Sequence, residues 1–170
     1  MIRLLLVFIT FFFLDNLLVL MLPIQPIVTH YQVIPNLFLT CLVMFVFFEK
    51  SNRPYYLAII FGILYDIFYA GIFGLYPILF TAAVFTVKRF FVGTTPINLF
   101  SMLSLLLGVM AATEWIVYFL VLTMTDLRMT FMHFAQFVLF PTLLFNTVFI
   151  FVAYPILISQ FRKYKKSQGQ

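Results

Sequence analysis

The chain has 170 residues, of which 65% are hydrophobic and only 9% are charged. A soluble domain is about half apolar and about a quarter charged, so a soluble fold of this length has too little interior for these side chains. The apolar runs are continuous, unlike the alternating strands of a transmembrane barrel. We therefore expect an all-α integral membrane protein, with residues 1–170 forming a single transmembrane helical domain.

Six apolar segments follow one another along the chain, at roughly residues 4–22, 34–48, 55–69, 72–87, 97–123 and 134–158. A transmembrane helix needs ~20 apolar residues, and the first, fifth and sixth segments reach this length easily. The third and fourth are shorter, and only Ala70 and Gly71 separate them. This spacing predicts a short helical hairpin with a tight tip. The alternative for this pair is one long span with a re-entrant piece, which would leave five crossings.

The basic residues predict the orientation, because cytoplasmic loops of membrane proteins collect Lys and Arg. With six crossings and the N-terminus inside, all ten basic residues except Arg128, beside Asp126, lie on the cytoplasmic side. Five crossings would place either Arg3 or the C-terminal cluster on the wrong side. We therefore predict that both ends are cytoplasmic, with residues 159–170 as a basic tail. The clustering on one side of a membrane also argues against a nucleic-acid partner.

The basic residues near the fourth and sixth segments are interpreted as anchors at the cytoplasmic surface. The alternative is contact with anionic lipid headgroups or with an acidic partner. The residues concerned are Lys88, Arg89, Arg162, Lys163, Lys165 and Lys166.

Three acids, Asp15, Asp66 and Glu114, fall within the apolar segments. A charge at the bilayer centre costs about 3 kcal/mol, and no basic residue lies at a comparable depth. Each acid must be protonated, hydrogen-bonded within the bundle, or matched by another protein. We interpret Asp15 with Asn16 as a helix-packing contact. Glu114 is either bonded to a helix neighbour such as Asn146, or is a proton-relay or substrate-binding carboxylate.

Small residues mark two further contact regions. Gly108 and Ala112 are four residues apart and predict a close helix–helix contact. Gly62 lies one turn before Asp66 on the same helix face, so a neighbouring helix can approach there. Gly71 and Gly74 then permit the tight return of the chain. These residues predict either a structural or partner-binding polar centre at Asp66, or an acid that faces water near the tip.

Signatures of catalysis are missing from the sequence. It contains no Gly-rich phosphate loop, no His-Glu-x-x-His and no Gly-x-Ser-x-Gly motif. His30, His133 and the single Cys41 are too few and too scattered for a metal site. We therefore expect a protein that is not an enzyme and that has no metal and no cofactor.

The hairpin resembles the hallmark motif of the rod shape-determining protein MreD family. Gly62-Ile-Leu-Tyr-Asp66 is followed by Gly71-Ile-Phe-Gly74-Leu-Tyr76. In that family a Gly-Leu-Leu-x-Asp stretch precedes a small residue, Leu-Gly and an apolar helix. This chain has Phe73-Gly74 where Leu-Gly is usual. Chain length, helix number and the short basic tail also agree.

The resemblance implies a non-catalytic, multi-pass component of the bacterial elongation machinery in the cytoplasmic membrane. Family members act with the bitopic protein MreC and, through it, with MreB, RodA and a class B transpeptidase, to organise lateral peptidoglycan synthesis and maintain cell shape. One alternative is the substrate-binding subunit of an energy-coupling-factor vitamin transporter. That alternative is disfavoured because residues 4–14 contain no pair of small residues four apart. A membrane enzyme is the other alternative.

Overall fold

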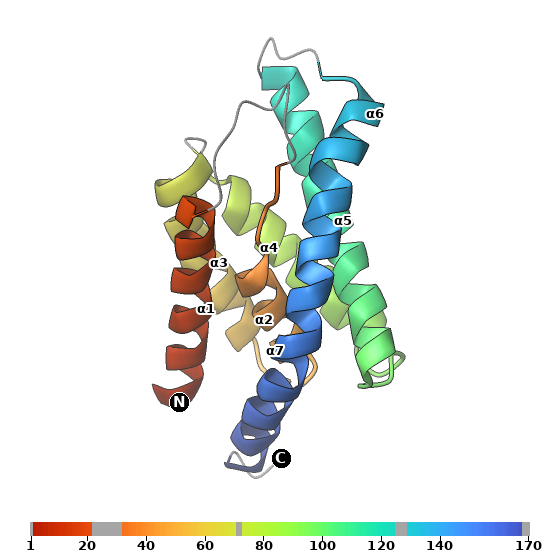
Figure 1. Ribbon diagram of the computed structural model, residues 1–170. Helices are drawn as coiled ribbons and strands as arrows, with labels where there is room; N and C mark the ends of the chain where they lie inside the picture. The colour runs from red at the N-terminus through yellow and green to blue at the C-terminus, as the bar shows by residue number, and fades with distance from the viewer. Residues whose placement is uncertain (1, 22–31, 71–72, 125–128, 168–170) are drawn as a thin grey trace.

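The computed structural model describes residues 2–21, 32–70, 73–124 and 129–167, and the regular structure in these residues is entirely helical. Figure 1 shows the helices as a single bundle, in which α1 begins and α7 ends on the same side. The helices are α1 (Ile2–Met21), α2 (Leu37–Val46), α3 (Arg53–Tyr65), α4 (Leu75–Thr86), α5 (Leu99–Met124), α6 (Phe131–Phe134) and α7 (Phe140–Ser167). Single π-helical turns extend three of them, at Asp66–Ala70, Val87–Phe91 and Ala135–Leu139.

Three helices of the described chain are long and apolar enough to cross a membrane. They are Arg3–Met21, Leu99–Met124 and the continuous stretch Phe131–Lys166. About a quarter of each span, 28%, is buried inside the bundle, so most of the apolar surface faces outward. Such surface is suited to lipid. The class of helical membrane protein is thus supported, whereas six crossings and the orientation stay predictions.

The short helix α2 forms the centre of the bundle. All ten of its residues are buried, and it contacts α1, α3, α4, α5 and α7 (Figure 1). Aromatic side chains fill the space around it, with the Phe38 ring 4.8 Å from that of Phe61 and 5.8 Å from that of Phe8. Offset and edge-on ring pairs of this kind add to the stabilisation from apolar burial.

The second segment differs from its prediction, which gave one helix over 34–48. Residues 32–36 are extended, and the helix covers only Leu37–Val46. Pro35 explains the difference, since proline disfavours the helical conformation of the residue before it and has no N–H of its own. The chain therefore enters the bundle as extended backbone and becomes helical only at the centre.

The third and fourth segments form the predicted hairpin with a slightly longer tip. The first arm runs from Arg53 through the π-helical turn to Ala70, and the second from Leu75 to Phe91. Gly74 precedes the second arm with a φ of 95°, a left-handed conformation that favours glycine. Gly71 lies outside the described residues.

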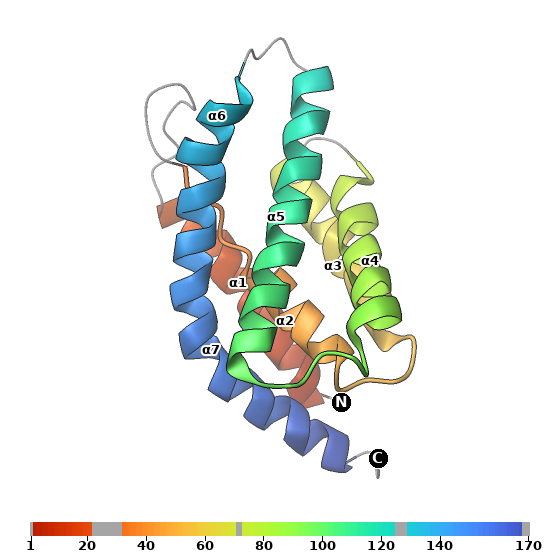
Figure 2. The same ribbon diagram turned by 90° about the vertical axis from the view of Figure 1, so that its right-hand side faces the viewer.

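The last helix is longer than the predicted 134–158, because helical structure continues to Ser167 through most of the expected tail. The burial of Leu157, Ile158, Phe161 and Tyr164 on one face explains the extension. The 36 residues of Phe131–Lys166 would measure ~54 Å if straight, well beyond the ~30 Å of a hydrocarbon core. Pro155 lies inside α7, and Figure 2 shows the helix bending so that its final turns run beneath the bundle.

The contact predicted at Gly108 and Ala112 is not made within the described chain. Both residues are exposed on α5, and a Cβ built on Gly108 meets no atom within 4 Å. The inward face of α5 is instead a stripe of larger residues at every fourth position, namely Met102, Leu106, Met110, Glu114 and Tyr118. Helix rotation is set by this broader stripe, which turns the small pair outward.

Candidate functional site

The extended segment before α2 is held by polar groups of α7 and of the π-helical turn that precedes it. The Gln32 N–H donates to the Phe137 carbonyl at 2.8 Å, and the Ile34 N–H donates to Thr142 Oγ1 at 3.1 Å. The Asn146 side chain serves two groups, since its Nδ2 donates to the Ile34 carbonyl and its Oδ1 accepts from the Asn36 N–H, both at 2.9 Å. Non-helical backbone at membrane depth is tolerated only where such partners satisfy it.

Glu114 joins the same network from the opposite side. Asn36 Nδ2 donates to Glu114 Oε1 at 2.9 Å, so the contacts run from α5 through the extended segment to α7. Glu114 is only 6% exposed. The sequence suggested Asn146 as a direct neighbour of Glu114, but Asn36 lies between them and bonds to both.

Asp15 caps the N-terminus of α2 from α1. Its two carboxyl oxygens accept from the N–H groups of Leu37 at 2.9 Å and Phe38 at 2.8 Å, and it also accepts from the Tyr65 hydroxyl of α3. The first N–H groups of a helix lack partners within the helix, and the positive end of the helix dipole favours an acidic group there. Among the described residues, the neighbouring Asn16 bonds back to the Phe12 carbonyl of its own helix, at 2.7 Å, and to no other helix. Of the predicted pair Asp15 and Asn16, Asp15 is therefore the residue that connects helices.

Asp66 closes the hairpin of α3 and α4. Its carboxyl oxygens accept from the N–H groups of Gly74 at 2.6 Å and Tyr76 at 2.9 Å, both at the start of the second arm. The residue is 4% exposed, so it does not face water at the tip. Gly62 supports the same closure, because a Cβ there would lie 2.5 Å from Pro77 Cα. The motif residues Gly62, Asp66 and Gly74 thus act together on one local structure.

A second polar cluster, missed by the sequence analysis, lies at the end of the bundle that carries both termini. Glu49 is buried, accepts from the Tyr164 hydroxyl at 2.7 Å and forms an ion pair with Arg53 at 3.3 Å. Burial favours a higher pKa for Glu49. The hydrogen bonds from Tyr164 and Ser51 and the charge of Arg53 outweigh burial, so its pKa lies below the ordinary value. The spacing of Glu49 and Arg53, four residues apart, was the available signal.

The basic residues that were interpreted as anchors have different surroundings. Lys88 Nζ donates to the carbonyls of Lys50 at 3.1 Å and Ser51 at 2.6 Å, and lies 5.3 Å from the centre of the Tyr55 ring. It therefore fastens the end of α4 to the connection between α2 and α3. The other predicted anchors lie on the surface at least in part, namely Arg89, Arg162, Lys163, Lys165 and Lys166.

The described acids of the apolar segments bind backbone amides or an amide side chain. Across the described ranges, no three His, Cys, Asp or Glu side chains are grouped so that they could hold a metal ion. His133 is among these residues, with its ring stacked on Phe137, whereas His30 lies outside them. The arrangement is one that stabilises irregular backbone within a helical bundle.

These features define a class of small helical membrane protein in which buried acids cap a central half-helix and a tight hairpin. A family model described as rod shape-determining protein MreD matches residues 1–164. The chain belongs to the MreD family of rod shape-determining membrane proteins. Neither a curated protein nor a solved structure gives a significant match. The family match therefore identifies a rod shape-determining membrane component.

Proposed function

We propose that the protein is a non-catalytic component of the bacterial cell-elongation machinery, which acts with an MreC-like bitopic membrane protein. Through that partner it organises lateral peptidoglycan synthesis with MreB, RodA and a class B transpeptidase, and so maintains cell shape. The family match over residues 1–164 carries this proposal. The hydrogen bonds of Asp15 and Asp66 to backbone amides support it, because they give these intramembrane acids a structural role.

The proposal includes six crossings of the cytoplasmic membrane with both ends inside. The beginning of α1 and the end of α7 lie at the same side of the bundle, as an even number of crossings requires (Figure 1). The connections after α2 and after α4 carry Lys50, Lys88 and Arg89, and Figure 2 shows these connections at that same side. This agrees with the collection of Lys and Arg on the cytoplasmic side of membrane proteins.

Copurification tests the partnership. The tagged protein is solubilised in mild detergent from a cell that contains an MreC-like protein, and the retained proteins are identified. We expect the MreC-like protein in near-equal amount, and expect the tagged chain to restore elongated shape in a cell depleted of its own copy. The variant Gly62→Leu, which blocks the approach of α4 at Pro77, should lose both properties. Gly108→Ala, at an open position, should keep them.

Capture of the wild-type chain without the MreC-like protein, from membranes that contain it, would contradict the partnership. The same tag on an unrelated multi-pass protein of similar length controls for incidental capture. Restored shape together with absent capture would separate a role in elongation from this particular partner.

A further inference from the structure

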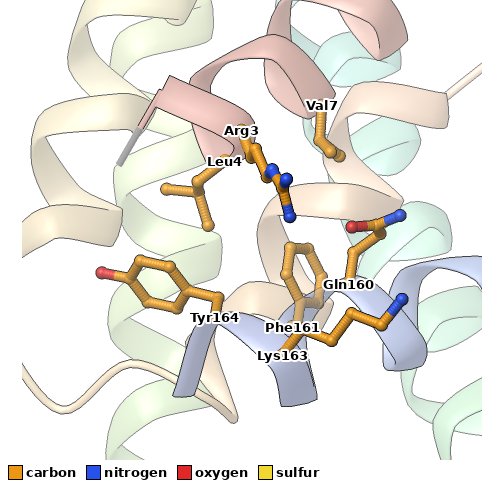
Figure 3. A pocket seen from close by; sticks show the side chains of 7 residues that line it. All are labelled: Arg3, Leu4, Val7, Gln160, Phe161, Lys163 and Tyr164. Atoms are coloured by element: carbon orange, nitrogen blue, oxygen red, sulfur yellow. The ribbon is translucent and has the colours of Figure 1, made fainter. Parts of the chain in front are cut away.

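A cavity of about 150 Å³ lies between the beginning of α1 and the last turns of α7. Figure 3 shows that one wall comes from α1 and the other from the part of α7 beyond Pro155. Its main lining residues are Arg3, Leu4 and Val7 on α1 and Gln160, Phe161 and Lys163 on α7. The cavity is separate from the buried network around α2.

The polar side of this cavity is positively charged and lacks an acidic partner. Arg3 and Lys163 are exposed, and neither makes an ion pair or a hydrogen bond with another described residue. Glu49, the described acid at this end of the bundle, is already bonded to Arg53 and Tyr164. The N-terminus of the 20-residue helix α1 adds its unpaired N–H groups and the positive end of its dipole. An anion is the ligand that this charge distribution favours.

The other side of the cavity is apolar. Leu4 and Phe161 are buried against the bundle, and Val7 follows one turn further along α1. Figure 3 shows the Arg3 side chain reaching toward α7, with Gln160 and Lys163 extending their polar ends to one side of the cavity. The lining therefore changes from cationic to apolar along α1, in the direction in which a membrane changes from headgroup to hydrocarbon.

The position of the cavity agrees with this polarity. Arg3 is the first residue of the apolar span Arg3–Met21, so a membrane crossed by this span would have its headgroup boundary near Arg3. Basic pockets between transmembrane helices at that level bind anionic headgroups, and guanidinium groups match phosphate oxygens with two parallel hydrogen bonds. A free phosphate ion has the same charged chemistry, but it would leave the partly exposed apolar wall at Val7 uncovered.

We propose that this cavity binds the headgroup phosphate of one anionic phospholipid, held by Arg3 and Lys163, with the lipid chains lying over Val7. The site is assigned from the cavity and its charges alone and does not rest on the proposed role in elongation. It gives these two basic residues a specific ligand in addition to general attraction to the membrane surface.

Native mass spectrometry of the full chain, released from detergent after titration with phosphatidylglycerol or phosphatidylcholine, tests the site. We expect one phosphatidylglycerol to be retained in preference to phosphatidylcholine. The double variant Arg3→Gln/Lys163→Gln should lower its affinity by at least about tenfold, since each cation supplies charge-assisted bonds. The control Arg162→Gln/Lys166→Gln removes the same charge outside the cavity. It should lower affinity by less than about threefold at ~0.15 M salt, where charges are screened over ~8 Å.

A second variant tests the cavity without changing charge. Val7→Phe should fill the apolar side and reduce retention, while circular dichroism and gel filtration confirm that the helices and the monodisperse state persist. Equal losses in the two double variants would overturn the site in favour of diffuse attraction. Equal retention of both lipids would also overturn it. Displacement of phosphatidylglycerol by millimolar inorganic phosphate would assign the cavity to a free anion and overturn the lipid.

Discussion

Gly62 and Gly108 are both helical glycines, but their surroundings differ. A Cβ on Gly62 would lie 2.5 Å from Pro77 Cα and 2.6 Å from Pro77 N, which are backbone atoms and cannot move aside cheaply. A Cβ on Gly108 meets nothing within 4 Å. The first glycine is therefore required by packing, and the second is not required by any contact in the described chain.

This difference predicts opposite effects of the same substitution. Gly62→Ala should lower the free energy of unfolding by about 2 kcal/mol or more, because the hairpin must open to admit a methyl group. Gly108→Ala should leave it unchanged or raise it by at most about 1 kcal/mol, through helix propensity. Unfolding of both variants in mixed micelles of increasing denaturing detergent measures the two values. Equal midpoints would contradict the close approach of α4 at Gly62.

Asp15 allows a second test at the same scale, because the single cysteine of the chain lies on the helix that it caps. Cys41 on α2 is fully buried, so the rate of thiol labelling reports the opening of this helix. Asp15→Asn keeps the size but places an NH₂ group against an N–H donor. We expect a loss of about 2 kcal/mol and labelling of Cys41 faster by about tenfold or more. Tyr65→Phe, which removes one of three donors, should show a smaller increase. Unchanged labelling in Asp15→Asn would contradict the cap.

The hydrogen-bonding roles of Asp15 and Asp66 were not equally visible in the sequence. Asp66 bonds to Gly74 and Tyr76, eight and ten residues away. The glycines between the two helical segments already predicted a tight turn of the chain at this place. Asp15 bonds to the amides of Leu37 and Phe38, more than twenty residues away. Every residue except proline carries an amide N–H, so sequence alone cannot indicate which one a distant carboxyl group will meet.

At the scale of elements, α1 and α5 were predicted to within two residues at each end, as 4–22 against Ile2–Met21 and 97–123 against Leu99–Met124. Their apolar runs have the length of a membrane span, which leaves little choice of structure. The second segment, predicted as 34–48, was wrong at its start, because residues 34–36 are extended and their backbone groups use partners on α7. The pattern of apolar residues indicates which segments are buried, but it does not indicate which groups hydrogen-bond to their backbone.

The extended segment predicts a strong effect at Asn146 and a weak one beside it. Asn146→Ala removes the partner of the Asn36 N–H and the closer of the two donors to the Ile34 carbonyl, which keeps only Asn36 Nδ2 at 3.4 Å among the described residues. The free energy of unfolding should fall by about 2 kcal/mol, since an unpaired backbone N–H away from water costs about 1–3 kcal/mol. Thr147→Ala is the matched control, because in the described part of the chain the Thr147 hydroxyl bonds only to the Leu143 carbonyl of its own helix. Its effect should stay within about 0.5 kcal/mol. Similar losses in the two variants would show that the network contributes little.

At the scale of the whole molecule, the hairpin determines the number of crossings. Its arms, Arg53–Ala70 and Leu75–Phe91, are only slightly shorter than the 19-residue span Arg3–Met21, the shortest of the three long spans. The connection that follows the second arm lies at the side of both termini in Figure 2. This arrangement agrees with two full crossings by the hairpin, as the distribution of Lys and Arg predicts.

Reporter fusions test this topology directly. A reporter that is active only in the cytoplasm should be active when fused after Phe91 and after Ser167. It should be inactive when fused after Met124, and an exported reporter should give the reverse pattern. The fusion after Ser167 gives an independent reading, because five crossings from an inside N-terminus would place the end of α7 outside, whereas six crossings place it inside. If the exported reporter were active after Phe91, the hairpin would be a re-entrant segment and the chain would cross the membrane fewer than six times.

The extended segment that enters the centre of the bundle also constrains the order in which the protein matures. Ile34 and Asn36 are synthesised early, yet the side chain that satisfies both, Asn146, is made more than a hundred residues later. Until the final helix leaves the ribosome, the half-helix α2 has the Asp15 cap but lacks this support. Completion of the core therefore waits for the end of translation, and a nascent chain that stops before α7 exposes unpaired backbone to the membrane or to the insertion machinery.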